Sequence, residues 1–156
     1  MISRTGTHTL KALVALHQIP VGSYAGANRL ARQIHAPSNY LGKLLRQIAR
    51  AGIVEGRKGR NGGFRLTGAW RSVSLFDALS PVEHFDSFKK CILGKQKCSR
   101  ANPCPLHQGW SHIRDQYREY LNTTTLSDLT EDRAAQSDRK SSPQDRQARS
   151  AGGGVR

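Results

Sequence analysis

The stretch that most constrains the fold of this chain runs from residue 38 to residue 66 and changes its pattern at Gly52. In its first half, SNYLGKLLRQIARA, leucine and isoleucine recur at steps of three, one and three, which is typical of a helix with one buried face. Ser38 suits the N-cap of this helix, and Gly52 suits its end, where Ile53 can add an apolar contact. The residues that this helix is expected to bury are Leu41, Leu44, Leu45 and Ile48.

The second half of the stretch, IVEGRKGRNGGFRLTG, predicts a β-hairpin with strands at 53–57 and 63–66 around a loop rich in glycine and arginine. Helical periodicity upstream predicts two further helices, over residues 7–18 and 25–35. Three helices followed by a hairpin form the sequential plan of a winged helix-turn-helix. We therefore expect a mainly α fold with a small β-hairpin as its wing, over residues 1–71.

The remainder of the chain divides into four segments. Residues 72–90 should connect through a short helix begun by a Ser74/Asp77 capping pair, and the cysteine-bearing segment 91–107 follows. Residues 108–130 contain most of a long C-terminal helix, predicted over 106–121. Residues 131–156 lack apolar periodicity and should be a disordered tail. The long helix has an apolar stripe that can pack on its own domain or on a symmetry mate, and its residues are Trp110, Ile113, Tyr117 and Leu121.

The positive charge of the chain is concentrated in its first half. The formal net charge is +14, and residues 1–71 hold twelve Lys or Arg against a single acid, Glu55. Residues 72–130 hold seven bases and six acids, so they are close to neutral. A folded unit this basic favours a polyanion, which predicts double-stranded DNA as the partner. Neither a membrane-length apolar run nor a secretory signal is present, so we expect a cytoplasmic protein with no membrane contact.

The start of the second motif helix enters the major groove in proteins of this fold. Asparagine there can bond adenine and lysine can reach guanine, whereas serine and tyrosine suit phosphates. Ser38 is equally interpretable as a cap alone, and Tyr40 as partly buried. Arginines on the wing suit a narrow minor groove. The expected DNA contacts are Ser38, Asn39, Tyr40 and Lys43 on the helix, with Arg57, Lys58, Arg60 and Asn61 on the wing.

All three cysteines, Cys91, Cys98 and Cys104, lie in the segment CILGKQKCSRANPCPLH. Its glycine, proline and lysine content is that of a loop, and disulfides are rare in the cytoplasm, so a metal or cluster site is favoured. The gaps of six and five residues are wide for a zinc knuckle and favour an iron–sulfur cluster. Zinc bound by the three cysteines and His107 is the alternative, and metal-free thiol sensing comes third.

Catalysis is not expected. The chain has no C-x-x-C motif, no glycine-rich cofactor loop and no paired carboxylates. A small thiol redox protein is therefore a less favoured alternative to a DNA-binding regulator.

Three stretches together resemble the IscR/NsrR/RirA family of bacterial winged-helix transcription regulators, over about residues 1–129. They are SNYLGKLLRQIARAGIVEGRKGRNGGFRL, the cysteine loop ending CPLHQGW, and TTTLSDL. The resemblance implies a homodimer crossed through the long C-terminal dimerisation helix, with an iron–sulfur cluster on the three cysteines. It also implies that the cluster state, set by iron supply, oxygen or nitric oxide, controls DNA affinity.

The resemblance leaves the cluster type and the fourth ligand open. Several family members have a first cysteine gap of five rather than six, so the spacing does not choose between 2Fe–2S and 4Fe–4S. IscR-like members use a histidine at the place of His107, and NsrR-like members use an acidic residue of the other subunit, where this chain has His8. We prefer His107. The alternative interpretations are a helix cap for His107 and a helix-start residue near phosphate for His8.

Overall fold

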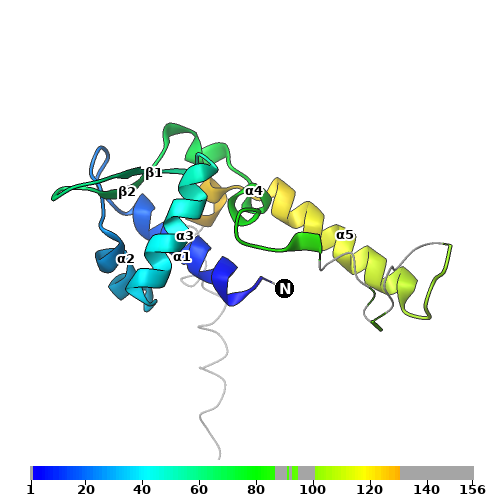
Figure 1. Cartoon of the computed structure of the whole chain (residues 1–156). Coiled ribbons are helices and arrows are strands. Elements are labelled where there is room, and N and C mark those ends of the chain that lie inside the picture. The colour runs from blue at the N-terminus through cyan, green and yellow to red at the C-terminus, as the bar shows by residue number, and fades with distance from the viewer. Residues whose placement is uncertain (1, 87–90, 92, 95–100, 131–156) are drawn as a thin grey trace, which may run out of the picture.

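A computed structural model describes residues 2–86, 91, 93–94 and 101–130 of the chain (Figure 1). The predicted tail at 131–156 and Cys98 lie outside the described residues. The first elements in chain order are the helices α1 (Arg4–His17), α2 (Ala27–Ile34) and α3 (Ser38–Arg50), and the strands β1 (Val54–Arg57) and β2 (Gly63–Leu66). They are followed by a 3₁₀ turn, η1 (Gly68–Ser72), the short helix α4 (Leu75–Leu79) and the long helix α5 (His107–Thr123). This is the mainly α architecture with a small hairpin that the sequence predicts.

The starts of helices α1 and α3 differ from prediction. Helix α1 begins earlier than residue 7 because Ser3 caps it, accepting a hydrogen bond from the Gly6 amide at 3.1 Å. The assignment of Ser38 as an N-cap is wrong, because Pro37 occupies that position and Ser38 is the first residue of α3. Pro37 has an extended ψ of 128°, as an N-cap residue does, so the helix begins at Ser38, one residue earlier than expected. Gly52 ends α3 as predicted, with a left-handed φ of +76°.

The wing is fastened to the start of α2. Strands β1 and β2 pair antiparallel, with Val54 opposite Leu66. Ala25 forms a bridge to Phe64, with both backbone hydrogen bonds at 2.9 Å. Ala25 is thus an added strand position rather than the first residue of a helix over 25–35. Gly63, at φ +144°, makes this approach possible, since a Cβ there would overlap the carbonyl oxygen of Ala25.

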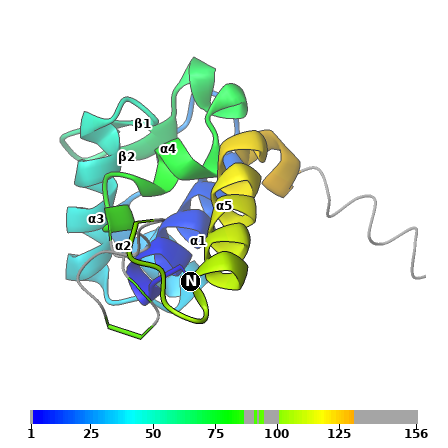
Figure 2. The ribbon, with the colours of Figure 1, turned by 90° about the vertical axis from the view of Figure 1, so that its right-hand side faces the viewer.

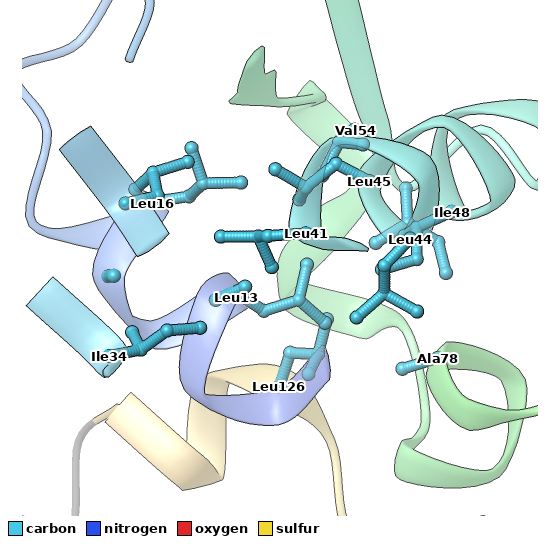
Figure 3. Packing of buried hydrophobic residues seen from close by; sticks show 14 of the residues in the cluster. Leu13, Leu16, Ile34, Leu41, Leu44, Leu45, Ile48, Val54, Ala78 and Leu126 are labelled. Atoms are coloured by element: carbon cyan, nitrogen blue, oxygen red, sulfur yellow. The ribbon is translucent and has the colours of Figure 1, made fainter. Parts of the chain in front are cut away.

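One apolar core joins the helices and the hairpin. The predicted face of α3 is buried, and Leu41, Leu45 and Ile48 are fully inaccessible. Figure 3 shows these side chains meeting Leu13 and Leu16 of α1, Ile34 of α2 and Val54 of β1. Burial of this amphipathic face, rather than helix propensity, stabilises α3 in the orientation that exposes its opposite face.

The C-terminal part returns to the core through a short backbone pairing. Ser74 caps α4 as predicted, accepting from the Asp77 amide at 3.0 Å. The Leu75 amide donates to Thr124 at 2.8 Å, and the Leu126 amide donates to Val73 at 2.9 Å. These bonds fix the C-terminal end of α5 beside α4, while its other end projects away from the three-helix body in Figure 1 and therefore faces the viewer in Figure 2. None of the described helices combines the length and apolar character needed to cross a bilayer.

Candidate DNA interface and cysteine site

The outer face of α3 carries the residues predicted to read DNA. Asn39 and Lys43 are exposed, whereas Ser38 and Tyr40 are partly buried. Because Leu41, Leu44, Leu45 and Ile48 occupy the inner face, Asn39 and Lys43 at i and i+4 project together on the other side. The structure therefore places these two polar side chains on the solvent-facing side of α3, and their contact with DNA stays a prediction.

Tyr40 is held by an aromatic contact with α1. Its ring meets the His8 imidazole edge-on, with centroids 5.7 Å apart and the planes at 69°. His8 is only 8% exposed, and its Nδ1 has no hydrogen-bond partner among the described residues. A buried nitrogen left unbonded costs free energy, so His8 is a polar group that needs an additional partner. This burial does not fit a helix-start residue near phosphate, which was one interpretation of His8, and its role as an alternative metal ligand stays a prediction.

The tip of the wing presents exposed cationic and polar side chains, as predicted. Gly59 takes a φ of +105°, and a Cβ on Gly62 would overlap the carbonyl oxygen of Arg57, so the tight turn requires both glycines. The exposed residues on and beside this turn are Arg57, Lys58, Arg60 and Asn61.

The base of the wing contains a polar group that sequence reasoning missed. The Arg65 Nε donates to the Glu55 carboxylate, and the Tyr24 hydroxyl donates to the same oxygen at 3.2 Å. The Arg65 guanidinium also lies over the Tyr24 ring, 4.7 Å from its centroid. The hydrogen bond from Arg65, reinforced by that from Tyr24, holds the pKa of Glu55 below its usual value. The cross-strand register, which places Glu55 opposite Arg65, is the signal that could have revealed the pair.

The ion pair between Glu55 and Arg65 affects the electrostatic field around the wing. Glu55 is the single acid among residues 1–71, and it is paired with Arg65. The cations at the tip of the wing therefore have no carboxylate of their own domain to compensate them. The wing and α3 together form a strongly positive surface.

Two of the three predicted cysteine ligands lie together. Cys91 and Cys104 are 5% and 6% exposed, and their Sγ atoms are 3.5 Å apart. The His107 amide donates to the Cys104 carbonyl oxygen at 2.9 Å, so the preferred fourth ligand begins α5 directly beside this pair. Cys98 lies outside the described residues, and no group of three or more potential metal-binding side chains occurs among the residues that are described. The donor chemistry of two converging buried thiols fits a thiophilic metal centre.

The predicted apolar stripe of α5 is divided between two environments. Leu121 is 1% exposed and packs in the core of its own chain. Leu106, Ile113 and Tyr120 are 50%, 58% and 57% exposed. The sequence prediction grouped Ile113 with Leu121. Leu121 lies at the C-terminal end of α5, which is fixed beside α4, whereas Ile113 lies about two turns nearer the end that projects away.

Comparison with known proteins identifies the family. A model of the Rrf2 family, described as an iron-dependent transcriptional regulator, matches residues 2–132. The chain belongs to the Rrf2 family. An HTH-type transcriptional regulator of Aquifex aeolicus is 26% identical over 122 residues, which are 76% of this chain and 85% of that protein. The protein aau3 of Rhizobium meliloti is 30% identical over 105 residues, 67% of this chain and 68% of that protein.

Solved structures share the fold of this Rrf2-family chain. CymR, the global cysteine regulator of B. subtilis, superposes with a TM-score of 0.68 at 22% identity, covering 83% of this chain and 95% of CymR. IscR of T. potens gives a TM-score of 0.66 at 20% identity, covering 85% of this chain and 87% of IscR. The family match and the IscR structure confirm the resemblance drawn from the sequence, and the matched family consists of transcriptional regulators rather than enzymes.

Proposed function

We propose that this Rrf2-family regulator is a homodimer that binds double-stranded DNA with an affinity set by an iron–sulfur cluster. The observation that carries the proposal is the approach of the Cys91 and Cys104 sulfurs to 3.5 Å in a buried site at the start of α5. Cys98 would be the third ligand and His107 the fourth, with His8 of the partner subunit as the alternative. When bound, the cluster would supply a centre that changes with iron supply, oxygen or nitric oxide.

The chain's own packing offers a route from the cysteines to the DNA-reading helix. Helix α5 begins at the cysteine pair and ends against α4, and α4 in turn contacts α1. His8 of α1 lies against Tyr40 at the start of α3. A change in the position of α5 would be passed to α3 through these contacts, shifting the population able to bind DNA.

The exposed face of α5 supports dimerisation. Together with Trp110 and Tyr117, the exposed residues Leu106, Ile113 and Tyr120 recur at alternating steps of four and three. This is the spacing of a coiled-coil seam, in which one apolar face packs against a second helix. A second copy of α5 fits this surface and would set two α3 helices at a fixed half-site separation.

The proposal is tested by anaerobic purification, followed by an absorption spectrum and iron, sulfide and zinc assays on one sample. Brown protein containing iron and sulfide, with visible absorbance lost in Cys104→Ser and retained in the control Ser111→Ala, is the expected result. Colourless protein that holds zinc would contradict the cluster. Selection from a random duplex pool tests DNA binding separately, because it requires no prior operator.

A regulator that senses through thiols without metal is the second candidate. The 3.5 Å approach of Cys91 and Cys104 also suits sulfur–sulfur chemistry. Metal-free protein that fails reconstitution but still binds DNA would favour this candidate over the cluster.

A further inference from the structure

An open pocket of roughly 430 Å³ lies between the first turn of α1 and the outer face of α3. Only Thr5 comes from α1, and all the other lining residues come from α3. They are Tyr40, Lys43, Leu44, Arg46, Gln47 and Arg50. Three of these residues, Arg46, Gln47 and Arg50, were not among the DNA contacts predicted from the sequence.

The pocket has a rigid apolar side and a cationic side. Leu44, only 2% exposed, belongs to the core, and the Tyr40 ring is held against His8. Lys43, Arg46 and Arg50 follow one another at i, i+3 and i+7, so one face of α3 carries all three charges. The three long cationic side chains thus extend from a helix whose opposite face is packed in the apolar core.

These three cations lack compensating charge within the described part of the chain. No ion pair joins Lys43, Arg46 or Arg50 to any described carboxylate. Glu83 lies beside the start of α1, where it accepts the Ser3 amide at 2.7 Å, and it does not line the pocket. Three like charges at close range repel one another, so a bound anion would stabilise the pocket.

We propose that this pocket seats a phosphate of the DNA backbone, with Arg46 and Arg50 as its charged contacts beside Lys43. Guanidinium groups present paired N–H donors that match phosphate oxygens, and the Gln47 amide and Thr5 hydroxyl add neutral donors. The inference rests on the proposed DNA binding and adds a backbone-anchoring site to it.

The position along α3 favours a DNA phosphate over a free one. At about 1.5 Å of rise per residue, Arg46 and Arg50 lie roughly 10 and 16 Å along the helix from Asn39. The major groove is about 12 Å wide, so a helix that enters with Asn39 at the bases brings its later turns to the flanking backbone. Contacts of this kind fix the register of a reading helix without reading sequence themselves.

The test is the salt dependence of binding to two 30-base-pair duplexes, one of mixed sequence and one selected from a random pool. Each neutralised phosphate contributes about 0.9 to the slope of log K against log salt. The proposed homodimer has two such pockets, and in each one a single phosphate is shared by the two arginines. Arg46→Gln and Arg50→Gln should therefore each lower that slope by about one, and the double variant by about two, weakening both duplexes to the same extent. Arg50→Lys keeps the charge and should keep the slope. Lys11→Gln is the matched control, since Lys11 is an exposed cation of α1 that does not line the pocket.

The outcomes separate this inference from the proposed function. Unchanged slopes in Arg46→Gln and Arg50→Gln, with wild-type binding intact, would overturn the phosphate site alone. A loss confined to the selected duplex would also overturn it, because it would make these arginines base contacts. An equal loss of slope in Lys11→Gln would show a general charge effect and refute a localised pocket. If wild-type protein bound neither duplex, the DNA-binding proposal itself would fail.

Discussion

Replacing Gly63 with alanine should detach the wing from the helical body. Gly63 is at φ +144°, and a Cβ would overlap the Ala25 carbonyl oxygen, which accepts the Phe64 amide at 2.9 Å. Opening the Ala25–Phe64 bridge gives up its two hydrogen bonds, at about 1 kcal/mol each. The unfavourable φ adds roughly 1–2 kcal/mol. Gly63→Ala should therefore lower the free energy of unfolding by about 3–4 kcal/mol, a figure built from these two contributions.

Gly59→Ala is the matched control, because Gly59 also has a left-handed φ, of +105°, but nothing lies within 4 Å of its Cβ position. It should cost only the conformational part, about 1–2 kcal/mol. Urea unfolding followed by circular dichroism, at one protein concentration, measures both variants. If Gly63→Ala were no less stable than Gly59→Ala, the Ala25 bridge would not hold the wing and the reasoning would be refuted.

Three further predictions address the cysteines, the dimer and the base of the wing. Cys98→Ala should lose the visible cluster absorbance, and a variant that kept a full complement of iron and sulfide would exclude Cys98 as a ligand. Ile113→Asp should shift the protein from dimer to monomer in sedimentation velocity, whereas Gln116→Asp, at an exposed position of the same helix, should remain dimeric. Glu55 has a lowered pKa in the folded protein because of Arg65, so its contribution to stability is complete above its ordinary pKa and is lost as the pH falls through the lowered value. Glu55→Gln should therefore flatten the stability profile below about pH 5 in acid titrations, and an unchanged profile would refute this role.

Most of the secondary structure could be predicted because, over residues 38–66, the apolar periodicity agrees with the positions of the glycines that end helices and form turns. The leucines of α3 fix its buried face, and Gly52 and the glycine-rich tip fix where the helix and the hairpin end. The errors at the starts of α1 and α3 are local shifts of the capping residue, whereas the error at Ala25 is decided by a backbone contact distant in sequence. Ala25 appears helical by local composition, but its pairing with Phe64, 39 positions later, makes it part of the wing.

The sites were less predictable than the fold. The cysteine segment stands out by its composition, whereas the burial of His8 against Tyr40 depends on how α1 packs on α3. Arg46 and Arg50 could have been found from their spacing relative to Lys43, but a charged row on a helix is ordinarily a solvated face. Only the pocket beside Thr5 distinguishes them from other exposed cations.

The most direct test of the central claim is the DNA affinity of one anaerobic preparation, measured before and after removal of its cluster. Iron and sulfide are quantified on the same sample, and the duplex is the one selected from the random pool. The cluster-loaded and cluster-free forms should differ in Kd by at least about fivefold, the lower range of allosteric coupling between sites. Equal affinities for the two forms, with the cluster present and then fully removed, would contradict the account.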